Sequence, residues 1–67
     1  MKKKKFIRKF VAYILHDEVA GQTLRFENEL TADRELYERI AAYDKRVMNG
    51  TLPHNYRCFI TRDYVLI

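Results

Sequence analysis

Serine is missing from this chain, and cysteine, proline and glycine are scarce. Among 67 residues there is one cysteine (Cys58), one proline and two glycines. Without serine, and with threonines that stand in no nucleophile motif, the chain lacks the parts of a hydrolytic site. A lone cysteine forms no internal disulfide, so the sequence favours a reducing compartment and a cytoplasmic location.

Long hydrophobic runs are missing as well. The unbroken apolar run at residues 10–15 falls far short of the roughly 20 residues of a membrane span. The lysines at 2–5 imitate the start of a signal peptide, but His16, Asp17 and Glu18 follow where a cleavage region would be small and neutral. An amphipathic helix on a membrane surface is not expected either, because residues 10–15 leave no clean polar face.

What is present indicates one small globular domain. The hydrophobic content is 48%, which is typical of a folded chain. We assign residues 1–67 to a single domain, with 1–5 as a basic N-terminal tail. A domain of about 60 residues buries only about 60% of its unfolded surface, so further burial against a partner or a second copy is expected.

Two strands are predicted in the first half of the chain. Residues 5–16 are rich in β-branched and aromatic side chains, which favours a strand, although apolar repeats at i, i+4 keep a helix open. In residues 23–30 the apolar Leu24, Phe26 and Leu30 alternate with polar residues, the period of a half-exposed strand. Residues 17–22 are predicted to form the hairpin loop between them.

A helix is predicted over residues 31–48. Leu36, Ile40, Tyr43 and Val47 form one apolar stripe at helical spacing. Thr31 is the predicted N-cap. Asn49 and Gly50 are predicted to end the helix. Residues 56–67 then read as one long strand, or as two strands with a turn at 61–63.

The predicted fold is therefore α+β, in the order ββαβ. A small antiparallel sheet of three strands, or four if residues 56–67 divide, carries one helix on one face. Strand one has apolar residues at both its even and its odd positions, so some must lie on the face away from the helix. Either a loop or the chain end covers them, or this face is an interface, and self-association as a dimer would bury it.

The charge pattern predicts contact with nucleic acid. Thirteen basic against nine acidic residues give a net charge of +4, and basic groups interleaved with aromatic rings suit phosphates and bases. If odd positions of strand one face outward, Lys9 and Tyr13 join Arg25, Arg57 and Phe59 on one face. The predicted electrostatic contacts are Lys3, Lys4, Lys5, Arg8, Lys9, Arg25 and Arg57, and the predicted interface residues are Phe10, Tyr13 and Phe59. The alternative is a solvated lysine tail.

An acidic cluster suggests a second function. Its members gather where the second strand leads into the helix, and they are Glu27, Glu29, Asp33, Glu35 and Glu38. Through this cluster or its sheet face, the protein could dock on a nucleic-acid-handling protein as an inhibitor or regulator of the phage or mobile-element type. Part of the cluster also serves the helix itself, through its dipole and a pair between Glu35 and Arg39.

No metal, cofactor or small-molecule site is predicted. Adjacent strand residues point to opposite faces, so His16 and Asp17 should not share a metal ion, and His54 is isolated. Cys58 has no histidine beside it in the sequence and reads as a small buried hydrophobe. The chain is therefore expected to bind rather than to catalyse.

Overall fold

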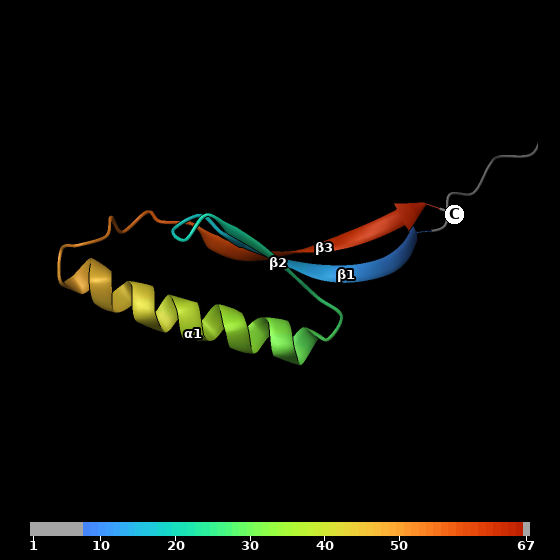
Figure 1. Ribbon diagram of the computed structural model, residues 1–67, viewed down its shortest axis with the longest axis horizontal. Helices are drawn as coiled ribbons and strands as arrows, with labels where there is room; N and C mark the ends of the chain where they lie inside the picture. Colours follow the sequence, from blue (N-terminus) through green and yellow to red (C-terminus); the bar gives the residue numbers. More distant parts are fainter. Residues whose placement is uncertain (1–7, 67) are drawn as a thin grey trace, which may run out of the picture.

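The computed structural model describes residues 8–66 and contains three strands and one helix (Figure 1). Strand β1 spans Arg8–Asp17, β2 Gln22–Phe26, α1 Glu29–Met48 and β3 Cys58–Leu66. The order ββαβ is as predicted. Strand β3 is a single strand, which settles the alternative left open for residues 56–67.

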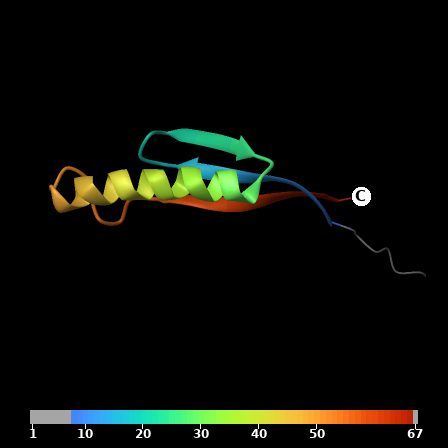
Figure 2. The same ribbon diagram turned by 90° about the horizontal axis from the view of Figure 1, so that it is seen from below.

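The sheet is antiparallel in the order β2-β1-β3, with α1 packed across one face. Viewed from the helix side, β2 and β3 flank the central β1 (Figure 2). A tight turn joins β1 to β2, and Gly21 takes a φ of 66° there, a conformation that favours glycine. The predicted α+β class and the helix on one face are confirmed.

Strand β1 contains a bulge at Val11. Phe10 lies opposite Tyr64 of β3, but Ala12 lies opposite Asp63, so one residue of β1 has no counterpart. A bulge of this kind shifts the alternation of side chains by one position. As a result, Phe10 and Tyr13 lie on the same face, with their ring centroids 4.6 Å apart.

The helix begins earlier than the sequence indicated. Asn28 is the N-cap, and its side-chain oxygen accepts hydrogen bonds from the backbone N–H of Leu30 at 2.8 Å and of Thr31 at 3.3 Å. The prediction of Thr31 as the cap and of a strand running to Leu30 was therefore wrong. An asparagine side chain can replace strand pairing by bonding locally to the backbone, which ends β2 at Phe26. The predicted helix end is confirmed, since Asn49 is the C-cap and Gly50 has a φ of 73°.

The hydrophobic core is small and lies between the sheet and α1. Leu15, at the centre of β1, is fully buried and lies opposite Leu24 and Ile60 of the outer strands. Ala32 of α1 is fully buried as well, and so is Ala12, which lies opposite Asp63 on the face of the sheet away from the helix. The predicted stripe of α1 at 36, 40, 43 and 47 is half-buried. Helix α1 is not long and apolar enough to cross a membrane.

A buried ionic cluster connects α1 to the end of the β1–β2 hairpin. Asp17, the last residue of β1, is 1% exposed and accepts hydrogen bonds from the Arg39 guanidinium, from the Tyr43 hydroxyl at 2.6 Å and from the Ala20 N–H at 2.9 Å. Burial by itself raises the pKa of Asp17, but these donors outweigh burial and lower it. Arg39 also bonds to Gln22 at 3.1 Å.

Candidate functional site

The sheet face opposite α1 carries the candidate site, which we call the open face. Asp17 points at the helix, so its neighbour His16 points away from it. The contacts of His16 with Thr61 at 2.8 Å and of Arg25 with Asp63 at 3.4 Å identify further members of this face. The open face consists of Ala12, Ile14, His16, Thr23, Arg25, Phe59, Thr61 and Asp63.

An aromatic stack lies on the open face across β1 and β3. The rings of His16 and Phe59 are 4.8 Å apart at 20° to each other, and the Arg57 guanidinium lies 4.8 Å from the Phe59 ring centroid. The two rings are half-buried, while Arg57 is exposed. The strand register causes this arrangement, because His16 lies directly opposite Phe59. The result is a π-surface edged by a cation, the combination that binds single-stranded bases in other proteins.

Both arginines at the open face already have acidic neighbours. Arg25 lies 3.4 Å from Asp63, and Arg57 lies 3.3 Å from Glu18. All four side chains are about half exposed, and pairs of this kind contribute only about 0–1 kcal/mol. A phosphate group can therefore compete for either guanidinium at little cost.

The remaining predicted basic residues fall into three groups. Lys9 lies opposite Val65, which is two positions from Asp63 on β3 and therefore shares its face. Lys9 thus lies at the end of the open face. Arg8 lies on the opposite side, 6.0 Å from the Tyr64 ring. Lys3, Lys4 and Lys5 lie outside the described residues. Residues 2–5 account for the whole net charge of +4, since the other nine basic residues match nine acidic ones.

Two of the three predicted interface residues lie away from the open face. Tyr13 faces the helix side and donates a hydrogen bond to a Glu29 carboxylate oxygen at 2.9 Å, so the odd positions of β1 after the Val11 bulge do not face outward. Phe10 follows it through the Val11 bulge and lies 6.0 Å from the Tyr64 ring. Phe59 is the one member of that set on the open face.

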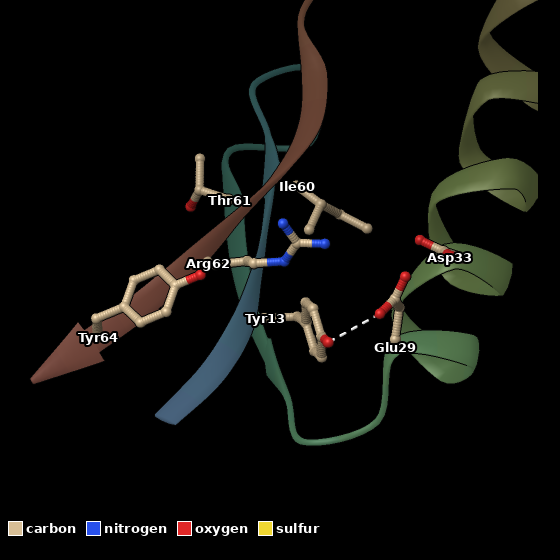
Figure 3. Close-up of a pocket in the computed structure, with 7 residues that line it drawn as sticks. All are labelled: Tyr13, Glu29, Asp33, Ile60, Thr61, Arg62 and Tyr64. Atoms are coloured by element: carbon tan, nitrogen blue, oxygen red, sulfur yellow. Dashed lines mark hydrogen bonds between the residues drawn. The ribbon is translucent and has the colours of Figure 1, made fainter. Parts of the chain in front are cut away.

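A groove opens between the start of α1 and strands β1 and β3 (Figure 3). Its volume is about 520 Å³. The Arg62 side chain extends toward the helix beside the Tyr13 ring, 5.9 Å from its centroid, and Glu29 and Asp33 face it from α1. The Glu29 carboxylate raises the pKa of Tyr13 through their hydrogen bond. Ile60, Thr61 and Tyr64 complete the lining.

The structure gives no support to metal or thiol chemistry in the described residues. Within residues 8–66 no three metal-binding side chains come together, and His16 and Asp17 face opposite sides of the sheet, as expected. Burial raises the pKa of the Cys58 thiol, and Asp17 adds to the effect, which disfavours the reactive thiolate.

Sequence reasoning missed His16 and Arg62 as site residues. His16 was considered only as a metal ligand, and its stacking on Phe59 follows from a register between residues 43 positions apart. Arg62 enters the groove because it lies directly opposite Tyr13 in the register of β1 and β3. Knowledge of the register between β1 and β3 would have identified both residues.

Comparison with known proteins gave no match. No family model matches the sequence, no curated protein matches it, and no solved structure matches the fold.

Proposed function

We propose that this protein binds single-stranded nucleic acid. The lysines near the N-terminus and the exposed arginines supply the attraction to phosphates, and the open face supplies contact with a base. The observation that carries the proposal is the stack of His16 and Phe59, edged by the Arg57 guanidinium 4.8 Å from the Phe59 ring. Cation and aromatic ring together form the basic unit of such surfaces.

The aromatic stack on the open face favours a single strand over a duplex. Bases in a duplex stack on each other and hide their ring faces, whereas an unpaired base can lie against a protein ring for about 1–3 kcal/mol. Two cross-strand rows run over the face, Arg25–Ile14–Thr61 and Thr23–His16–Phe59. The Arg25 guanidinium thus lies on one side of the aromatic stack and the Arg57 guanidinium on the other. A single nucleic-acid strand could lie across the sheet between these two cations.

The test is fluorescence anisotropy with labelled single-stranded DNA, RNA and duplex DNA, at low and at physiological salt. Single strands should bind more tightly, and affinity should fall steeply with salt. Replacing Lys3, Lys4 and Lys5 together with alanine should lower the slope of log affinity against log salt by about 2, at about 0.7 per phosphate contact. No binding to any probe at low salt would remove the proposal.

Variants at the open face separate stacking from charge. Phe59→Leu keeps an apolar side chain in the sheet but removes the ring, and should weaken binding to single strands without changing the salt slope. Arg57→Ala should weaken binding and lower the slope. Arg34→Ala is the matched control, because Arg34 is exposed on α1 and has the same charge. Equal effects of Arg57→Ala and Arg34→Ala would show that only net charge matters.

A second candidate is a protein-binding inhibitor or regulator, and the groove favours it. Glu29 and Asp33 present carboxylates beside the Tyr13 ring, which suits a basic side chain of a partner protein. Affinity capture with the native chain and with the Glu29→Gln, Asp33→Asn double variant would test it. A partner retained by the native chain and released by the variant supports this function, whereas equal retention excludes the groove.

A further inference from the structure

Strand β3 is the longer outer strand of the sheet. It has nine residues, against five in β2 on the other side. Figure 2 shows the two strands on opposite sides of β1. Within residues 8–66 no strand pairs with the outer side of β3. Its outward N–H and C=O groups therefore form a template for another strand.

The direction of the free backbone groups follows from one hydrogen bond. The Glu18 N–H donates to the Arg57 carbonyl at 3.0 Å, so the backbone groups of Arg57 point toward β1. Successive residues of a strand point these groups to alternate sides. Cys58, Ile60, Arg62 and Tyr64 consequently direct their N–H and C=O groups outward.

Strand β3 lacks most of the features that keep an edge from pairing. It contains no proline, lysine or glycine, and the bulge lies in β1. Its last residues are exposed and apolar, with exposed fractions of 44% for Tyr64, 46% for Val65 and 65% for Leu66. Edges of folded proteins are usually protected by short length, charged side chains (lysine above all), proline or a bulge. Of these, β3 has only the charges of Arg62 and Asp63, and a strand of this length is still suited to pairing with a partner of complementary charge.

We propose that two copies of the chain pair antiparallel through β3. A two-fold axis through the sheet relates the copies, so residues that lie opposite each other must lie on the same face. Placing Ile60 on this axis sets Arg57 opposite Asp63 of the second copy, twice. Registers with Arg62 or Asp63 on the axis set like charges opposite each other, which is unfavourable. Charge complementarity therefore selects the register centred on Ile60.

The dimer extends the sheet to six strands in the order β2-β1-β3-β3-β1-β2. Both helices lie on one face, and the two open faces join into one surface on the other. This brings the two stacks of His16 and Phe59 onto neighbouring halves of one sheet. The inference stands on the geometry of β3 alone, so it holds whether or not the joined surface binds nucleic acid.

The first test is the mass in solution, measured by sedimentation over a range of concentrations. The native chain should show twice its mass of 8.1 kDa. Arg62→Pro should be monomeric, because proline removes the N–H that points to the second copy and removes no hydrogen bond between β3 and β1. Arg62→Ala, the matched control, keeps that N–H and should remain a dimer. A native chain that is monomeric throughout, or an Arg62→Pro variant that still dimerises, overturns the proposal.

The second test fixes the register and does not depend on the proline variant folding. Arg62→Cys places a new thiol opposite Cys58 of the second copy, where paired Cα atoms about 5.5 Å apart allow a disulfide. Within one chain, positions 58 and 62 are about 13 Å apart along a strand and cannot bond. Oxidation should therefore give a covalent dimer whose linked peptides contain positions 58 and 62. Linkage of Cys58 to Cys58, or no covalent dimer, contradicts the register.

Discussion

Replacing Asp17 with asparagine should destabilise the protein by about 2–3 kcal/mol at neutral pH. The carboxylate is buried and binds the Arg39 guanidinium and the Tyr43 hydroxyl, and breaking a buried ion pair costs about 3–5 kcal/mol. We expect a cost slightly below that range because the Arg39 side chain is 21% exposed and Glu35 lies 3.9 Å from its Nε, so the remaining guanidinium keeps contact with water and with a carboxylate. A chain of this length has a total stability of only about 3–10 kcal/mol.

The pH dependence gives this prediction a sharper form. Because the pKa of Asp17 is lowered in the folded state, its contribution is complete at neutral pH, declines below about pH 4 and vanishes once the folded-state carboxyl is protonated. The difference in free energy of unfolding between the native chain and Asp17→Asn should therefore shrink as the pH falls. Urea unfolding followed by circular dichroism at several pH values measures it. Equal stability at neutral pH, or a difference that persists in acid, would refute the reasoning.

Three further outcomes are expected. Asn28→Ala should cost about 1 kcal/mol in urea unfolding by removing the helix cap, whereas Thr31→Ala should stay within about 0.5 kcal/mol. The hydrogen bond from Tyr56 to Asp44 raises the pKa of Tyr56 to about 12, so Asp44→Asn should move one tyrosine toward about 10 in an absorbance titration. Cys58 should react slowly with a thiol reagent in the folded protein and rapidly in denaturant, since burial raises its pKa.

Local patterns in the sequence predicted most of the fold. The helix followed from an apolar stripe and from the Asn49–Gly50 end, both of which act within a few residues. The start of α1 was missed because the alternation in residues 23–30 indicated a strand that runs through Asn28, whereas the Asn28 side chain accepts a hydrogen bond from the first turn of the helix. In the sequence alone, an asparagine that caps a helix cannot be distinguished from an asparagine within a strand. The pairing of the strand decides between them.

The candidate site could be predicted only in part. Arg25, Arg57 and Phe59 were expected on one face, and the structure places Arg25 and Phe59 there with Arg57 at its edge. The positions of Tyr13 and His16 depend on which face of β1 meets the helix. The buried Asp17–Arg39 pair decides that face, and it joins residues 22 positions apart, beyond the reach of local periodicity.

The unmatched residue in β1 has a consequence for the genetics of this protein. On one side of Val11 the even positions of β1, such as Phe10, share a face with the helix, and on the other side the odd positions, such as Tyr13, do so. Loss of the Val11 codon would remove the bulge and restore a single alternation, in which Phe10 stands two positions before Tyr13 and keeps its place on the helix side. The residues of β1 would also keep their partners on β3. An in-frame deletion of three nucleotides at this codon would thus straighten the strand without moving an aromatic side chain from one surface to the other.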